Sequence, residues 1–351
     1  MRKQDPPQSP AALYRRLSGV TTGFKAYTPA QCDAIWPLIQ EIGRLKAQKN
    51  AIILAHSYVK QDIVSTVADY VGDSLELSRI ANSTDASMIV FSAVRFMAET
   101  AKILNPDKTV LIPSLINGCS LADSISARDV VALRQQYPRH AFICYINTTA
   151  AVKAICDCCV TSSNVYDIVE HWPTQHIYFL PDALMGKNLV QELARRQSDK
   201  QVLYSSGTCY VHQEYTPDMI DYMRHTYPEI YILAHPECHP SLIQACDFVG
   251  STSQMIQEVG RTQAKQYFLL TECGLSNRLA MQYPDKRFVG TCTLCRYMKS
   301  NTLDQIVTAL RDPEPHQIVD IDAAVQTEAR ACIQMMFDMS DSIDRLARAR
   351  V

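Results

Sequence analysis

The sequence repeats one apolar pattern three times, as AIILAH at residues 51–56, AFICY at 141–145 and IYILAH at 230–235. Each copy ends on a histidine or a tyrosine, and these residues, His56, Tyr145 and His235, lie 89 and 90 residues apart along the chain. One period shared by three segments is typical of a chain built from similar units. We therefore expect three units of nearly equal length.

Further short apolar runs follow each copy and alternate with longer stretches of helical character. These runs are MIVF (88–91), TVLI (109–112), HIYFL (176–180), QVLY (201–204), QYFLL (266–270) and RFVG (287–290). Strands that are apolar throughout are typical of parallel sheets covered by helices on both faces. The predicted fold class is therefore α/β, with three repeated three-layer, parallel-sheet units around a pseudo-threefold axis.

The period also predicts the limits of the units. The first covers residues 29–118, the second 119–208 and the third 209–298. Amphipathic helices in residues 299–351 are expected to complete the first unit. Residues 1–28 carry prolines and polar side chains, so we expect a poorly ordered, loosely held arm there.

The charge balance excludes several classes of partner. The chain carries 34 basic and 36 acidic side chains, with no long run of either sign. Such a balance does not indicate the basic surface that binds nucleic acid or an anionic membrane. No apolar run reaches the roughly 18 residues of a membrane span, and the start MRKQDPPQSP lacks the apolar core of a signal peptide. We expect a cytoplasmic protein whose partners are small molecules.

A cysteine follows the last strand of each unit. These cysteines are Cys119, Cys209 and Cys295, and they lie 90 and 86 residues apart. Because ligands of parallel α/β sheets bind beyond the carboxyl ends of the strands, three units around one axis would bring the thiols into one pocket. Thiolates bind zinc, copper or iron-sulfur clusters, and a structural zinc ion would need a fourth close ligand. Three thiolates therefore favour a 4Fe-4S cluster with one open iron that acts as a Lewis acid.

The other cysteines are weaker candidates, although 13 cysteines are many for a cytoplasmic chain. The group of Cys156, Cys158 and Cys159 is more typical of buried core thiols. Cys292 forms a C-x-x-C pair with Cys295 and fits a ligand, a resolving thiol or an incidental residue. Spacing alone does not choose between Cys292 and Cys295.

Polar residues at the strand ends share the same register. The pairs are His56 with Tyr58, Tyr145 with Asn147, and His235 with Glu237. Such side chains transfer protons or orient carboxylates. A second set, Ser74, Ser162, Ser251 and Thr252, falls where helices should begin. These hydroxyl groups are expected to cap the helices, to bind carboxylate or phosphate at the helix N-termini, or to do both.

Nine motifs together resemble the quinolinate synthase family, from about residue 30 to the end of the chain. They are AHSY (55–58), GDSLELSR (72–79), VRFMAETAKIL (94–104), YINTTAAVKA (145–154), TSSN (161–164), GTCYVH (207–212), HPEC (235–238), GSTSQ (250–254) and CRYMK (295–299). The resemblance implies an enzyme of de novo NAD biosynthesis that condenses iminoaspartate with dihydroxyacetone phosphate to quinolinate, phosphate and water. It also implies three α/β domains around one 4Fe-4S cluster, which agrees with the repeat.

The same resemblance implies roles for individual residues. The cluster ligands would be Cys119, Cys209 and Cys295, which favours Cys295 over Cys292. The catalytic residues would be Tyr58, His235 and Glu237. Residues implied in substrate binding are His56, Ser74, Tyr145, Asn147, Ser162, His212, His235, Glu237, Ser251 and Thr252. An L-aspartate oxidase is the implied supplier of iminoaspartate, and a closing motion between domains would exclude water.

The chain departs from the family pattern in a few places. Ser57 stands where relatives often carry a bulkier residue, Cys292 is the only cysteine beside Cys295 where some relatives have a third, and residues 1–28 match nothing. These departures put a thiol redox switch in doubt. Two other interpretations are a non-catalytic iron-sulfur protein, which would need no convergent acid-base groups, and a hydro-lyase with the same cluster. Substrate turnover would discriminate among the three.

Overall fold

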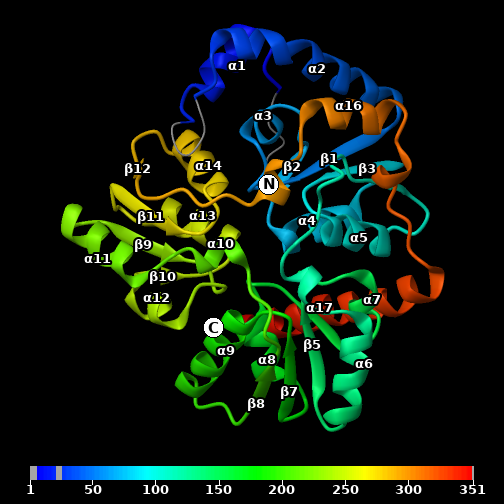
Figure 1. Cartoon of the computed structure of the whole chain (residues 1–351), viewed down its shortest axis with the longest axis vertical. Helices are drawn as coiled ribbons and strands as arrows, with labels where there is room; N and C mark the ends of the chain where they lie inside the picture. The colour runs from blue at the N-terminus through cyan, green and yellow to red at the C-terminus, as the bar shows by residue number, and fades with distance from the viewer. Residues whose placement is uncertain (1–5, 21–25, 350–351) are drawn as a thin grey trace.

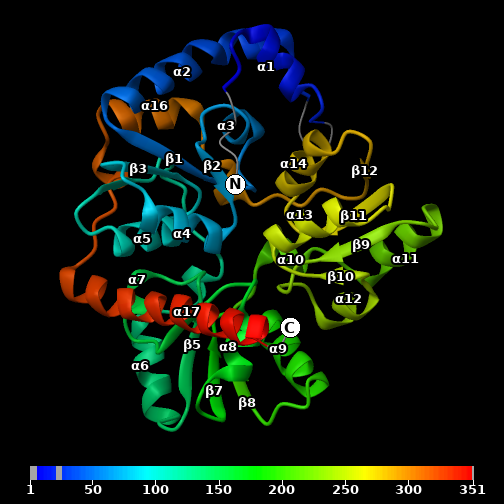
Figure 2. The ribbon, with the colours of Figure 1, turned by 180° about the vertical axis from the view of Figure 1, so that it is seen from behind.

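The structure, a computed structural model, describes residues 6–20 and 26–349. These residues form three four-stranded sheets with helices around them, and Figure 1 shows the sheets arranged around the middle of the molecule. Figure 2 shows the same arrangement from behind. The predicted α/β fold with three repeated parallel-sheet units is confirmed.

All three sheets have one strand order, in which the first and third strands of the unit lie in the centre. The first sheet runs β2 (Tyr70–Gly72), β1 (Ala51–His56), β3 (Met88–Ser92), β4 (Thr109–Leu111). The second runs β6 (Cys158–Val160), β5 (Ala141–Tyr145), β7 (His176–Leu180), β8 (Gln201–Tyr204). The third runs β10 (Phe248–Val249), β9 (Tyr231–Ala234), β11 (Gln266–Leu270), β12 (Arg287–Phe288). Neighbouring strands are parallel, so the carboxyl ends of each sheet lie along one edge.

The helices occur at matching places in the three units. The first strand of each unit follows α2 (Pro29–Gln48), α6 (Ala127–Gln136) or α11 (Pro217–Thr226). Later connections contain α3 (Gln61–Val64), α4 (Ser74–Ser83) and α5 (Arg95–Leu104), then α7 (Ala150–Lys153), α8 (Val165–His171) and α9 (Ala183–Arg195), then α12 (Pro240–Ala245), α13 (Thr252–Arg261) and α14 (Gly274–Gln282). The remaining elements are α1 (Pro10–Leu17), η1 (Ala122–Ser124), α10 (Tyr210–Gln213), α15 (Arg296–Lys299), α16 (Leu303–Arg311), η2 (Pro315–Gln317) and α17 (Ala323–Ala349). None of the helices in the described ranges combines the length and the hydropathy needed to cross a membrane.

The sequence pattern does not predict β2, β6 and β10, which each form one edge of a sheet and contain only two or three residues. An aspartate stands just before each of them, and its carboxylate accepts a hydrogen bond from a backbone N–H of the neighbouring strand. The pairs are Asp69 with Ile53, Asp157 with Phe142 and Asp247 with Ile232, at 2.7 to 2.8 Å. These aspartates lie 88 and 90 residues apart and are a further copy of the repeat.

The segment expected to be a loosely held arm contains the helix α1. This helix packs against α2 and buries Leu13 and Leu17, and Ser9 caps it by accepting a hydrogen bond from the Ala12 amide. Two leucines four residues apart give the helix an apolar face that α2 covers, so the expectation is wrong for this part of the arm. Residues 1–5 and 21–25, which belong to the same expectation, lie outside the described residues.

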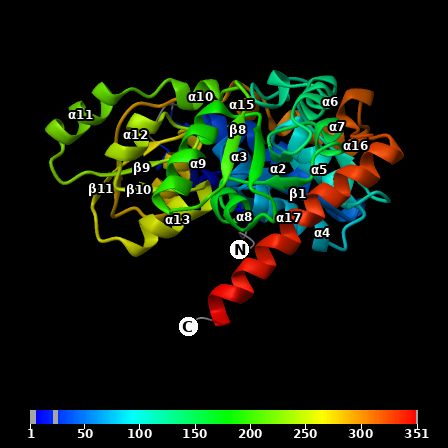
Figure 3. The same ribbon diagram turned by 90° about the horizontal axis from the view of Figure 1, so that it is seen from below.

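The C-terminal segment divides between two units. Helix α16 packs against α2 and β3 of the first unit, whereas α17 packs mainly against β6, α7 and α8 of the second. Figure 3 shows the C-terminal end of α17 projecting from the body of the molecule. The expectation that residues 299–351 complete the first unit is therefore wrong for α17, whose buried face covers the second sheet. The unit boundaries themselves stay a prediction.

The packing of α17 makes its buried residues important for stability. Met336 is 0% exposed, whereas the neighbouring Met335 is 39% exposed. Replacing a buried methionine by alanine removes apolar contacts and leaves a cavity, so we expect Met336→Ala to lower the free energy of unfolding by about 2 to 5 kcal/mol. Met335→Ala, the matched control, should change it by about 0.5 kcal/mol or less. Denaturant unfolding of both variants measures this, and equal small effects would contradict the packing of α17.

Candidate active site

The carboxyl ends of strands from all three sheets open onto one shared cavity. Thirteen of the fourteen residues that the sequence predicts for the site line it. They are His56, Tyr58, Ser74, Cys119, Tyr145, Asn147, Ser162, Cys209, His212, His235, Glu237, Thr252 and Cys295. The exception is Ser251, which is buried beside the cavity and caps α13. The repeat therefore brings together residues that are far apart in sequence.

The three cavity cysteines occupy equivalent backbone positions. Cys209 and Cys295 are the N-cap residues of α10 and α15, and Cys119 stands just before the turn that leads into η1. Backbone N–H groups two or three residues further on point at each sulfur and favour its thiolate form. These amides belong to Leu121 and Ala122, to His212, and to Tyr297 and Met298.

Hydrogen bonds also join the loops that carry the cysteines. Ser120 donates its hydroxyl to the carbonyl of Thr208 at 3.1 Å, which connects the first loop to the second. The Arg296 amide donates to the hydroxyl oxygen of Tyr210 at 2.7 Å, which connects the third loop to the second. The three loops therefore form one connected rim around the cavity.

The donor set fits an iron-sulfur cluster. Burial raises the pKa of the Cys119 thiol to about 12 and also raises the pKa values of Cys209 and Cys295. Three thiols in a low-dielectric site thus need a cationic partner before they ionise together. Among the described residues, no fourth cysteine lines this cavity, so a bound cluster would keep one iron without a thiolate from the chain.

A second donor set overlaps the first. It consists of one ligand atom from each of three residues, all within 4.8 Å of one another: Cys209, His212 and Glu237. A lone metal ion could use these atoms, but a cluster held by three thiols would use Cys209 and leave His212 and Glu237 beside it. The two arrangements differ in their dependence on Cys119 and Cys295.

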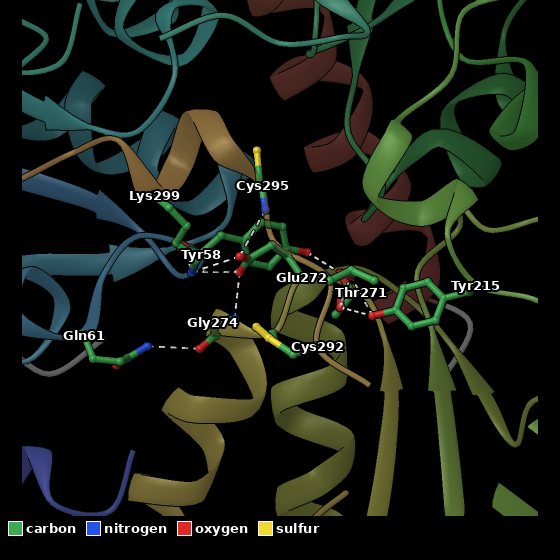
Figure 4. The surroundings of a disulfide bond; sticks show 11 residues. Tyr58, Gln61, Tyr215, Thr271, Glu272, Gly274, Cys292, Cys295 and Lys299 are labelled. Atoms are coloured by element: carbon green, nitrogen blue, oxygen red, sulfur yellow. Dashed lines mark hydrogen bonds and ion pairs between the residues drawn. A yellow bond between two sulfur atoms is a disulfide. The ribbon is translucent and has the colours of Figure 1, made fainter. Parts of the chain in front are cut away.

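The remaining cysteines lie elsewhere. Cys292 forms a disulfide with Cys273, with their Cα atoms 5.2 Å apart, and does not pair with Cys295 (Figure 4). Cys156, Cys158 and Cys159 are buried outside the cavity, as expected for core thiols. The same region buries Cys144, whose sulfur lies 3.8 Å from that of Cys332 on α17.

A chain of hydrogen bonds crosses the cavity wall and joins all three units. The Tyr58 hydroxyl lies 2.7 Å from Thr271 Oγ1, and this oxygen lies 3.1 Å from Nε2 of His212. Nδ1 of His212 lies 3.0 Å from one oxygen of Glu237, and the Tyr145 hydroxyl donates to the other at 2.7 Å. A proton entering at one tyrosine therefore has a hydrogen-bonded path toward the other.

The two histidines at the strand ends are held in the same way. The Tyr58 amide donates to Nδ1 of His56 at 3.2 Å, and the Glu237 amide donates to Nδ1 of His235 at 3.4 Å. Burial lowers the pKa of each histidine to about 3. Both rings are therefore neutral near pH 7, and because Nδ1 accepts, each carries its proton on Nε2.

The pKa of the Glu237 carboxyl is lowered, whereas the pKa values of Tyr58 and Tyr145 are raised. Burial raises the pKa of Glu237, but its interactions with His212, His235 and Tyr145 together lower that pKa overall. Burial raises the pKa values of Tyr58 and Tyr145. The site thus contains an ionised carboxylate between two protonated phenols, an arrangement suited to general base and general acid roles.

The hydroxyl residues of the second set divide into caps and cavity residues. Ser251 caps α13 by accepting a hydrogen bond from the Gln254 amide, while Thr252 is the first residue of that helix. Ser74 is the first residue of α4, whose cap is Asp73, and Ser162 precedes α8 without capping it. The capping interpretation therefore holds for Ser251 alone, and the other three hydroxyl groups face a cavity into which the N-termini of α4 and α13 open.

Sequence reasoning missed several residues of this site. Glu272 lines the cavity, and Thr271 connects Tyr58 to His212. The signal for Glu272 was available, because it lies 90 residues after Asp182 at the same place in its unit. Asp182 forms a parallel β-bridge with Gly207, and Glu272 forms one with Thr293. Gly207 and Thr293 each lie two residues before a cavity cysteine.

Comparisons with known proteins agree on one family. A family model described as "Quinolinate synthetase A protein" matches residues 40–338. The chain is 43% identical over 331 residues to a quinolinate synthase of Agrobacterium fabrum, covering 94% of this chain and 92% of that protein. It is 44% identical over 328 residues to quinolinate synthase 2 of Mesorhizobium japonicum, covering 93% and 97%. It is 44% identical over 298 residues to a quinolinate synthase of Xylella fastidiosa, covering 85% and 86%.

Proposed function

The chain belongs to the quinolinate synthase family, and on this premise we propose that it condenses iminoaspartate with dihydroxyacetone phosphate in NAD biosynthesis. The products are quinolinate, phosphate and two molecules of water. The observation that carries the proposal is the single cavity, which combines three thiols with a hydrogen-bonded acid-base chain from all three units. We place the reaction in the cytoplasm.

Cys119, Cys209 and Cys295 would hold a 4Fe-4S cluster. When bound, the cluster supplies an open iron that acts as a Lewis acid toward substrate oxygen atoms and helps hydroxide leave. The amides that point at each sulfur would stabilise the thiolates that hold it. Cys292 takes no part, because its sulfur is bonded to Cys273.

Anionic groups of the substrates would bind where the helices begin. Ser74 and Thr252 stand in the first turns of α4 and α13, where unpaired N–H groups and the helix dipole attract carboxylate or phosphate. Ser162 and the amide of Asn147 add hydrogen-bonding groups from the second unit. The neutral rings of His56 and His235 can donate from Nε2 without adding charge. Together these groups would hold two reactants in one orientation, which by itself supplies much of a rate gain.

Proton transfers would use the chain between the two tyrosines. Glu237, as a carboxylate, can take a proton from a substrate carbon or nitrogen during enamine formation and ring closure. Tyr145 donates to Glu237 and holds it in place, and Tyr58 can donate its phenolic proton to a leaving oxygen. Thr271 and His212 connect the two ends, so the proton taken at one place can be returned at another.

An anaerobic assay tests the proposed function directly. We expect cluster-loaded protein to form quinolinate from dihydroxyacetone phosphate and iminoaspartate, the latter generated in the assay by an L-aspartate oxidase. Omission of either substrate should abolish the product. A loaded protein that forms no quinolinate would contradict the proposal and favour an electron carrier or sensor. Hydration or dehydration of a simple hydroxy acid by the same protein would favour a hydro-lyase.

A further inference from the structure

A buried ion pair lies between a cavity cysteine and a tyrosine of the site. Glu272, two residues after the end of β11, has a fully buried side chain, and Lys299, the last residue of α15, has a side chain that is 10% exposed. Their charged groups are 2.9 Å apart. Figure 4 shows Glu272 between Lys299 and Cys295, with Tyr58 close by. The acid-base chain described above does not include this pair.

Each member of the pair holds backbone groups of the site. One oxygen of Glu272 accepts a hydrogen bond from the Cys295 amide at 3.3 Å, and the other accepts from the Gly274 amide at 2.7 Å. The Lys299 ammonium group donates to the backbone carbonyl of Tyr58. The pair therefore connects the third cysteine loop, the start of α14, and a strand-end residue of the first unit.

The space around the pair is tightly filled. A Cβ atom added to Gly274 would lie 2.7 Å from a carboxylate oxygen of Glu272, 2.8 Å from Nζ of Lys299 and 3.0 Å from Cα of Tyr58. These separations show that the Glu272 carboxylate, the Lys299 ammonium group and the Tyr58 backbone all pack against Gly274. Small displacements of the pair should therefore reach both Cys295 and Tyr58.

The other two units lack this arrangement. In each unit a backbone amide after the third strand donates to a carbonyl two residues before the cavity cysteine. The pairs are Arg95 with Asn117, Ala183 with Gly207 and Cys273 with Thr293, at 2.7 to 3.1 Å. The residues just before these donors are Val94, Asp182 and Glu272. The valine has no carboxylate, and Asp182 uses one oxygen to cap α9. The Cys119 amide does donate to a carboxylate, that of Asp123, at 3.2 Å. Among the described residues, however, only in the third unit does the carboxylate that accepts from the cysteine amide also pair with a lysine.

We propose that Glu272 and Lys299 are positioning residues that fix the Cys295 loop relative to Tyr58, and so set the placement of the cluster against an acid-base group. The inference rests on the proposed function. Stability gives no sufficient reason for such a pair, because a buried ion pair can often be replaced by neutral residues of similar size without loss of stability. Removing one partner is harmful in any case, since it leaves the other charge buried and unpaired.

The experiment compares single and double variants with a matched pair elsewhere. The variants are Glu272→Gln, Lys299→Met and the double variant. The control is Lys46→Met with Asp69→Asn. The side chains of Lys46 and Asp69 are 18% and 6% exposed, and their charged groups lie 2.6 Å apart. They also hold backbone groups, at Val67 and Ile53, but lie outside the cavity. The measurements are iron and sulfide content, melting temperature, the EPR spectrum of the reduced cluster, and kcat and KM per loaded cluster.

We expect the single variants to lower kcat per cluster about 10- to 100-fold, the range seen when groups behind metal ligands are removed. The KM values should change only a few-fold, and the EPR spectrum should shift because the Cys295 loop is displaced. The double variant should recover the melting temperature but not kcat. The control variants should lower the melting temperature and leave kcat per cluster and the spectrum unchanged.

Three results would overturn the inference. In the first, kcat per cluster stays within about twofold of wild type in both single variants. In the second, the double variant recovers kcat together with its melting temperature. In the third, the EPR spectrum is unchanged in all variants. If wild-type protein itself forms no quinolinate, the proposed function fails instead. The spectrum and the iron content then still decide whether the pair positions Cys295.

Discussion

Replacing Cys119, Cys209 or Cys295 by alanine is expected to remove both the 4Fe-4S cluster and quinolinate formation. Each thiol follows the last strand of a different sheet and reaches the shared cavity on its own loop. Since no other cysteine of the described chain lines the cavity, no other thiol can replace a missing one. Removing a ligand should exceed the roughly 10- to 100-fold loss typical of groups behind a ligand, so we expect activity to fall by more than about 100-fold.

Iron and sulfide counts on anaerobically purified variants measure this effect. The controls are Cys292→Ala and the double variant Cys273→Ala/Cys292→Ala, the second of which leaves no unpaired thiol from the disulfide. Both should retain the cluster. A fully loaded Cys295→Ala protein would overturn the assignment of the third ligand. If the Cys119→Ala and Cys295→Ala variants keep their metal, but variants at Cys209 and His212 lose it, the site binds a lone metal ion instead.

Glu237→Gln is expected to retain the cluster and lose quinolinate formation by about 10² to 10⁴-fold, the usual contribution of a general acid or base. The substitution keeps the shape of the side chain and its capacity to accept a hydrogen bond from Tyr145, but removes the negative charge and the ability to take a proton. Its amide also cannot accept from His212 and Tyr145 through both terminal atoms, as the carboxylate does. The loss should appear mainly in kcat.

Glu258→Gln is a matched control for this prediction. Glu258 is also buried in the third unit and also accepts a hydrogen bond from a tyrosine, Tyr231, at 2.8 Å, but it does not line the cavity. Its variant should turn over at close to the wild-type rate per cluster. Unchanged turnover in Glu237→Gln would remove that residue from the mechanism. A fall in its iron content would instead make Glu237 a metal ligand.

The repeat was readable in the sequence because it depends on residues close together in the chain. Nine of the twelve strands in the described residues follow from apolar runs, and the strand ends at His56, Tyr145 and His235 follow from the period. The carboxyl ends of parallel strands lie along one edge whatever the details of packing, so the gathering of Cys119 and Cys209 at one place was also predictable.

Other features needed the folded chain. Cys292 forms its disulfide with Cys273, 19 residues away in sequence, and not with Cys295, which is only three residues away. Helix α17 covers the second sheet, although it follows α16, which packs on the first unit. The connecting role of Thr271, between residues of different units, has no local signal.

The sequence by itself determined three α/β units, the strand ends that carry polar residues and the three cysteines, because periodicity and short motifs are properties of neighbouring residues. Only the tertiary structure decided which groups from different units touch, such as Lys299 with the carbonyl of Tyr58, 241 residues apart. Such contacts depend on how whole units pack against one another. That packing is fixed by the sum of many weak interactions, and no local pattern records it.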